Sequence, residues 1–239
     1  MRVLVLVALA GCSNLLGIDN LEGPPPNPDG SNEPDGPTPD GPIDVPATIT
    51  ITGTVVQVDM NSSTPFPLAI VSLVDSPGAM ADAVTTDGAG AFSLVIQTGG
   101  NPVDGALDVV GARETLSYFS RPLVADLANA TIQVFDNTLF QDTASVCGRP
   151  FDPQRPTVIA FVIDAQGNPV DGAPLTSSPA ATWCGQKAGG GIVTDTSGAD
   201  GFAFAFELPP GSVQITAGAT TRSFQTPAAS NVFATLRLP

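Results

Sequence analysis

The side chains able to do chemistry in this chain are few, and the most versatile of them is missing. Among 239 residues there is no histidine, which removes the commonest general base and the commonest protein metal ligand. There is one lysine, Lys187, and one tyrosine, Tyr118. We therefore expect no enzyme activity, no catalytic residue, no metal site and no cofactor.

The three cysteines are the remaining reactive side chains, and they fall into two groups. Cys12 lies near the start of the chain, whereas Cys147 and Cys184 lie in its second half. If the chain is exported into an oxidising compartment, an even pair of this kind favours a disulfide. Two separate buried thiols at Cys147 and Cys184 are the alternative.

The first residues have the pattern of an export signal. Arg2 is followed by an unbroken apolar run over residues 3–10 and then by small residues up to Cys12. The run is too short to span a bilayer as a permanent helix, which takes about 20 apolar residues. We therefore predict that residues 1–11 are a signal peptide that is removed.

Residues 9–12, Leu-Ala-Gly-Cys, resemble the lipobox of bacterial lipoproteins, in which the cysteine takes a diacylglycerol group and becomes the new N-terminus. The resemblance implies that Cys12 is lipidated and anchored by more than one acyl chain. In Gram-negative lipoproteins an aspartate after that cysteine tends to mark retention in the inner membrane, so Ser13 implies the outer membrane. The location expected is the cell envelope, facing the periplasm or the surface. An ordinary secretory peptide with a chance cysteine is the alternative.

The segment from residue 12 to residue 46 is expected to be a disordered linker. It is rich in proline and glycine, repeats Pro-Asp-Gly at Pro28, Pro34 and Pro39, and carries acidic but no basic residues. Such a segment has too few apolar groups to fold and repels itself. The formal charge of the whole chain is −15, which argues against nucleic-acid binding because that needs a basic face.

After the linker the sequence alternates apolar and polar residues in short segments separated by turn-forming residues. A period of two predicts half-buried strands. The predicted strands cover residues 48–58, 68–74, 91–97, 106–111, 114–119 and 131–135 in a first group, and 158–163, 192–195, 201–208, 213–217, 221–225 and 232–238 in a second. In the second group residues 172–175 are also expected to lead into a further short strand. No longer stretch carries a helical stripe, and residues 124–130 are expected to make at most one helical turn. The fold class predicted is all-β, with two tandem β-sandwich domains, prealbumin-like or immunoglobulin-like, at residues 47–140 and 141–239.

The turns between the predicted strands carry a second resemblance. A Thr-Asp turn followed by glycine and phenylalanine occurs at residues 86–92 and again at residues 194–202, and Leu-Pro-Pro-Gly follows at residues 208–211. This order is similar to that of the carboxypeptidase regulatory-like domain, a prealbumin-type sandwich. The resemblance is better for the second domain, because the first lacks the Leu-Pro-Pro-Gly turn. The hexapeptide Asn-Pro-Val-Asp-Gly-Ala at Asn101 and Asn168 is interpreted as reused turn chemistry rather than as a repeat register.

Two aromatic residues are candidates for ligand binding. Trp183 lies in an irregular stretch, and Trp183 and Tyr118 could each stack on a sugar ring. The competing interpretation, which we favour, is that Trp183 packs over the Cys147–Cys184 bridge as local core. Phe202, Phe204 and Phe206 alternate along a predicted strand and are expected to be interior.

These features predict a non-enzymatic, membrane-anchored lipoprotein that displays β-sandwich modules for a structural or protein-binding role. Its expected partners are the membrane, through Cys12, and an envelope protein or glycan. The alternative is a carbohydrate-binding accessory module of a polymer-degrading system.

Overall fold

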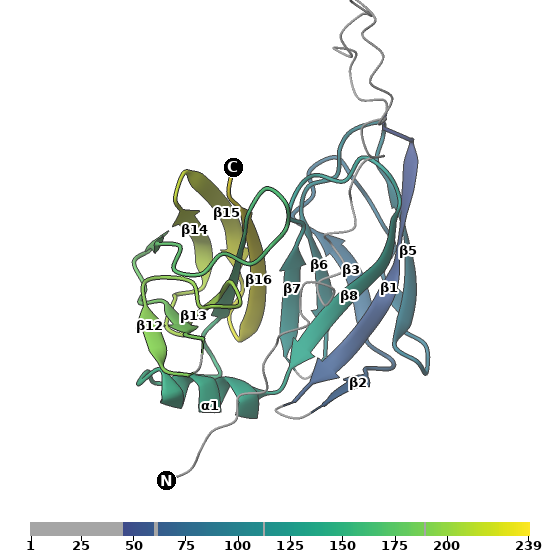
Figure 1. Ribbon diagram of the computed structural model, residues 1–239. Coiled ribbons are helices and arrows are strands. Elements are labelled where there is room, and N and C mark those ends of the chain that lie inside the picture. Colours follow the sequence, from purple (N-terminus) through teal and green to yellow (C-terminus); the bar gives the residue numbers. More distant parts are fainter. Residues whose placement is uncertain (1–44, 60–61, 112, 189) are drawn as a thin grey trace, which may run out of the picture.

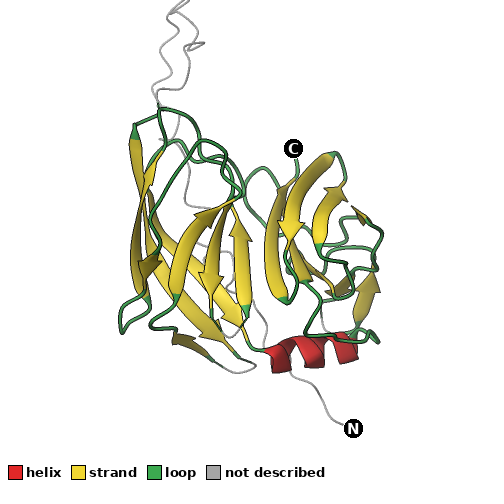
Figure 2. Cartoon of the chain, turned by 180° about the vertical axis from the view of Figure 1, so that it is seen from behind, coloured by secondary structure: helices red, strands yellow, loops and turns green. Residues whose placement is uncertain are grey.

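The computed structural model describes residues 45–59, 62–111, 113–188 and 190–239. The predicted signal peptide, the lipidation site Cys12 and nearly all of the predicted linker lie outside these residues. The described chain folds into two tandem β-sandwich domains, and one short helix follows the first of them (Figures 1 and 2). The predicted all-β class is confirmed.

The strands follow the predicted segments closely. Those of the first domain are β1 (Thr48–Val58), β2 (Ser63–Pro65), β3 (Ile70–Val74), β4 (Val84–Thr85), β5 (Ala91–Gln97), β6 (Ala106–Val110), β7 (Glu114–Tyr118) and β8 (Leu127–Phe135). Those of the second are β9 (Thr157–Ile163), β10 (Leu175–Ser178), β11 (Cys184–Gln186), β12 (Ile192–Thr194), β13 (Phe202–Ala205), β14 (Gly211–Ala217), β15 (Thr220–Thr226) and β16 (Ser230–Arg237). The three short strands β2, β4 and β11 were not predicted.

The two domains share one strand arrangement. In the first domain β1 pairs antiparallel with β5 and parallel with β8, and the opposing sheet has the order β3-β6-β7. In the second domain β9 pairs antiparallel with β13 and parallel with β16, and the opposing sheet has the order β10-β14-β15. The fold is therefore an internal structural repeat.

The repeat extends to single hydrogen bonds. In each domain one buried hydroxyl accepts from one backbone N–H and donates to another residue's carbonyl. The Thr86 hydroxyl accepts from the Ala69 N–H and donates to the Phe66 carbonyl, both at 2.9 Å. The Ser197 hydroxyl accepts from the Ala173 N–H at 3.0 Å and donates to the Val170 carbonyl at 2.6 Å. Thr86 therefore corresponds to Ser197 in the structure, whereas aligning the repeated Thr-Asp motif would pair Thr86 with Thr194. In the same register Leu68 corresponds to Gly172, because their N–H groups donate to the carbonyls of Thr86 and Ser197.

The hexapeptide does not follow this register. Asn101 precedes β6, whereas Asn168 precedes β10, and these two strands are not equivalent in the repeat.

The two domains are joined by backbone hydrogen bonds. The last strand, β16, pairs in parallel with β9 of its own domain and with β7 of the first. This produces one nine-stranded sheet with the order β12-β11-β13-β9-β16-β7-β6-β3-β4. Figure 1 shows β16 beside β7 at the centre of the molecule. The pairing leaves no free hinge between the two sandwiches.

The helix α1 (Asn137–Val146) lies between the domains in sequence and was not predicted. Asp136 caps it by accepting a hydrogen bond from the Thr138 N–H at 2.7 Å. Only Phe140 and Ala144 on the helix are buried, which is too narrow an apolar face to stand out in the sequence. The predicted domain boundary between residues 140 and 141 falls inside α1, and residues 124–130 form a loop and the start of β8 rather than a helical turn.

The hydrophobic residues form three clusters. One fills the interior of the first sandwich. A second fills the interior of the second sandwich and continues onto Leu116 and Tyr118 of β7, so it belongs to both domains. The third lies between α1 and the outer face of the second domain and contains Phe202 and Phe206. These two phenylalanines are buried as predicted, but beneath the helix, because Ala203 and Ala205 point into the sandwich. Phe204, which was also predicted to be interior, is only partly buried at the edge of this third cluster.

Candidate functional site

Cys147 and Cys184 form a disulfide, with their Cα atoms 6.0 Å apart. Cys147 is the C-cap of α1, and Cys184 begins β11. The bridge was predicted from the sequence, and the alternative of two separate thiols does not hold. It fastens the end of α1 to the sheet whose outer face the helix covers.

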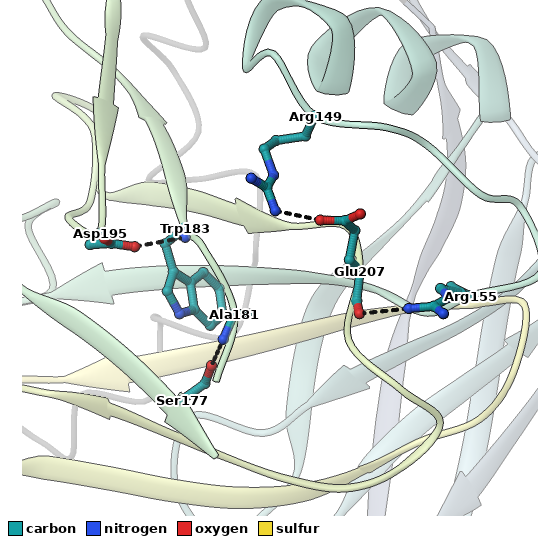
Figure 3. A network of polar contacts seen from close by, with 7 residues as sticks. All are labelled: Arg149, Arg155, Ser177, Ala181, Trp183, Asp195 and Glu207. Carbon is teal, nitrogen blue, oxygen red and sulfur yellow. Dashed lines mark hydrogen bonds and ion pairs between the residues drawn. The ribbon is translucent and has the colours of Figure 1, made fainter. Parts of the chain in front are cut away.

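Trp183 precedes Cys184 in the chain and points into the second sandwich, whereas Cys147 packs against the cluster beneath α1. Trp183 is core as predicted, but its packing over the bridge stays a prediction. Its side chain is 0 % exposed and belongs to the core cluster shared by the two domains. Its backbone N–H donates to the Asp195 carboxylate at 3.1 Å, as Figure 3 shows. A buried indole offers no ring face to a sugar, so Trp183 acts here as core.

A polar network surrounds the segment between α1 and β9 (Figure 3). The Glu207 carboxylate pairs with Arg149, and the Glu207 carbonyl accepts from Arg155 Nη1 at 3.2 Å. Both arginines bind the same residue, Glu207, which follows β13. They therefore hold this segment against the second domain. The Glu207 carboxylate is already paired with Arg149, so we interpret this network as structural rather than as a ligand-binding site.

Tyr118 lies at the junction of the domains and is almost fully buried. Its hydroxyl donates to the Asp75 carboxylate of the first domain and accepts from the Gln225 N–H of the second at 3.1 Å. Burial, followed by the hydrogen bond to Asp75, raises the pKa of Tyr118 above its usual range. Arg222 lies over the ring at 5.9 Å and contacts Asp104 at 3.5 Å. Tyr118 therefore joins the domains and exposes no face for stacking.

A second cation at the junction was missed by the sequence analysis. The buried Arg113 side chain donates to the carbonyls of Ala229 and Ser230 at 3.1 and 2.9 Å and lies over the rings of Phe140 and Phe151. Burial lowers the pKa of Arg113 to about 10. It links the start of β7 to the loop before β16 and to the helix.

Asp108 and Glu114, on the neighbouring strands β6 and β7, are two carboxylates whose pKa values are raised by burial. Asp108 is only 8 % exposed, and burial, followed by the charge of Glu114, raises its pKa to about 6. Burial also raises the pKa of Glu114. The signal in the sequence is an aspartate inside the apolar strand Ala-Leu-Asp-Val-Val, which the sequence analysis did not single out.

No metal centre emerges from the described part of the chain. None of its His, Cys, Asp and Glu side chains gather in groups of three or more that could hold an ion. Of the residues proposed from the sequence, the structure joins Cys147 and Cys184 in the disulfide and places Trp183 and Tyr118 in the same core cluster.

No family model matches this chain. No curated protein matches it either.

Solved structures give weak matches only. The chain is 10 % identical to the shaft pilin SpaA of Lactobacillus rhamnosus GG, covering 80 % of this chain and 98 % of that one at a TM-score of 0.25. The chain is also 10 % identical to the minor pilin GBS52 of Streptococcus agalactiae. That match covers 80 % of this chain and 96 % of the pilin at a TM-score of 0.27. The match to the Bacillus anthracis TIE protein, at 11 % identity and a TM-score of 0.23, covers 80 % of this chain and spans only 34 % of that one. TM-scores this low carry no functional meaning, so the fold rests on the strand pairing described above.

Proposed function

We propose that this chain is a non-enzymatic lipoprotein of the cell envelope. Cys12 carries the lipid, the acidic linker acts as a spacer, and the two sandwiches form a rigid body that is displayed for a structural or protein-binding role. The resemblance of residues 9–12 to a lipobox supports the anchor. In the described residues no helix is long and apolar enough to cross a bilayer.

The observation that carries the display role is the nine-stranded sheet. Tandem domains with a polar interface commonly move relative to each other. Here β16 bonds to both β7 and β9, and a single core cluster spans the junction. A body of this kind keeps its surfaces at a fixed distance and orientation, which suits a spacer or a docking module.

The two residues proposed for carbohydrate binding are not available at the surface. Trp183 and Tyr118 were the candidates, and both rings are buried in the core cluster that fills the second sandwich and continues onto β7. Sugar binding by stacking needs an exposed ring face. We therefore retain a protein-binding or structural role as the proposed function.

The anchor is tested by metabolic labelling with an alkyne-tagged fatty acid in a bacterial host. Labelled protein in the membrane fraction is expected, and Cys12→Ser should lose the label and the membrane association together. Cys147→Ser with Cys184→Ser is the matched control, because it removes thiols without touching the lipobox. Unlabelled protein released into the medium would refute the proposal.

A further inference from the structure

Leu68 combines a strained backbone conformation with a highly exposed side chain, and the packing of the fold requires neither. Its φ is 60°, in the left-handed region that L-residues with side chains avoid, and its side chain is 80 % exposed. The equivalent residue of the second domain is Gly172, with a φ of 70°. Glycine takes this conformation without strain. The first domain therefore keeps a strained, exposed leucine where the second shows that glycine suffices, and strain of this kind concentrates at functional positions.

Leu68 belongs to a small apolar surface. Ile70 of β3 and Val110 of β6 are register partners, and they are 46 % and 49 % exposed. We call Leu68, Ile70 and Val110 the Leu68 patch.

The second domain has no such surface. Its register places Pro174 and Gly218 where the first domain has Ile70 and Val110, because Leu175 pairs with Ala217 as Val71 pairs with Val109. The patch is therefore a property of the first domain and not of the shared fold.

An acidic group borders the patch. Glu114 begins β7 and lies beside Val110, because the adjoining residues Val109 and Thr115 are register partners. Asp108, two residues before Val110 on β6, is almost fully buried and is not part of this border. The neighbouring Arg113 is buried, and its guanidinium is occupied by backbone carbonyls. The whole chain has a formal charge of −15, so a second copy would bring like charges to this surface.

The patch lies at the end of the first domain opposite to Val45, where the described chain begins. The carbonyl of the next residue, Pro46, accepts a hydrogen bond from the Thr98 hydroxyl near the start of β1. Strand β3 starts at Ile70 and runs toward that end, so the patch lies at the opposite end, which is the lower end in Figure 1 near β2.

We propose that the Leu68 patch docks a cationic, apolar segment of a partner protein. An apolar side chain of that segment covers Leu68, Ile70 and Val110, and a lysine or arginine side chain beside it lies against Glu114. The inference deepens the proposed display function and rests on it. It does not depend on lipidation, so the two can fail separately.

The test uses the full chain carrying Cys12→Ser, titrated with a synthetic peptide of alternating leucine and lysine. The control peptide replaces each lysine by glutamate. We expect saturable binding of the lysine peptide only, seen by calorimetry and by shifts of the Leu68, Ile70 and Val110 methyl signals. Leu68→Gly should weaken it about tenfold, as truncation of an interface anchor does. Glu114→Gln should weaken binding and reduce its dependence on salt.

Val95→Thr is the matched control variant, because Val95 is 50 % exposed on β5, away from the patch. It should bind the lysine peptide as the parent chain does. Equal binding of both peptides, binding that survives Leu68→Gly, or no binding at all would overturn the proposal. So would self-association of the parent chain that Leu68→Gly abolishes, since the occupant would then be a second copy.

Discussion

Val232 of β16 lies in register with Leu116 of β7, so a strand of the second domain is hydrogen-bonded to a strand of the first. Both side chains are buried and belong to the same core cluster, together with Ile215 of the opposing sheet. The second sandwich thus extends its interior over a strand of the first. The core of the second domain is therefore incomplete without these residues of the first.

Because of this shared core, the two domains should unfold in a single transition. Leu116→Ala should lower the free energy of unfolding by about 2–5 kcal/mol, as deletion of a buried leucine does. Differential scanning calorimetry should show the one peak moving as a whole. Val95→Ala, at an exposed position, should change the free energy of unfolding by no more than about 0.5 kcal/mol. Two peaks, of which only one responds to Leu116→Ala, would show that the domains are independent.

Reduction of the Cys147–Cys184 bridge should destabilise the second domain. The bridge closes a separation of 37 residues, for which the chain-entropy model gives about 4 kcal/mol. The melting temperature should fall by several degrees in reductant. The double variant Cys147→Ser with Cys184→Ser should melt at the reduced temperature and ignore the reductant. An unchanged melting temperature, with two titratable thiols in the native protein, would contradict the bridge.

The repeat allows a reciprocal exchange at Leu68 and Gly172, which are equivalent residues with a left-handed φ in both domains. Leu68→Gly should raise the free energy of unfolding by about 1 kcal/mol, because it removes a strained conformation and no buried contact. Gly172→Leu should lower it by about the same amount, since it introduces the strain at an exposed position. Urea denaturation measures both. A loss of stability in Leu68→Gly would mean that the leucine contributes to folding.

Asp108 should make stability depend on pH. Its pKa of about 6 in the folded state lies above the ordinary value of 3.8, so the folded protein holds this proton more tightly. The stability gained is fully present below about pH 4 and is lost as the pH rises through about 6. Asp108→Asn should remove this dependence and raise the free energy of unfolding at pH 7 by about 1–3 kcal/mol.

The control for this pH effect is Asp164, whose shift has the opposite sign. The side chain and backbone N–H of Asn168 lower the pKa of Asp164, so Asp164→Asn should not stabilise the protein at neutral pH. Urea denaturation across the acidic range measures both variants. A pH dependence that Asp108→Asn leaves unchanged would assign it to another group.

Most strands could be predicted from the sequence because their apolar alternation is local. β1 and β5 begin and end at the predicted residues, and their side chains are buried in alternation as expected. The short strands β2, β4 and β11 carry too few residues to show a period. α1 was missed because it buries only Phe140 and Ala144, and those two become apolar contacts only once the second domain's outer face is in place.

The candidate sites were likewise predictable only where the signal is local in the sequence. The disulfide could be predicted because cysteine number and spacing are visible in the chain. The pairing of β16 with β7 could not, since it depends on long-range contacts between strands that each look like ordinary edges. The exposed position of Leu68 was hidden inside a segment predicted as strand over residues 68–74, whereas β3 begins at Ile70.

The place of β16 between β7 and β9 also constrains the order in which the molecule can assemble. During synthesis β7 emerges long before β16, so one of its edges must wait for a partner from near the end of the chain. Until then an unpaired edge is open to other strands, which is a route to aggregation. Newly made chains shortened before Ser230 should therefore depend on chaperones or be degraded, even though every strand of the first sandwich is already present.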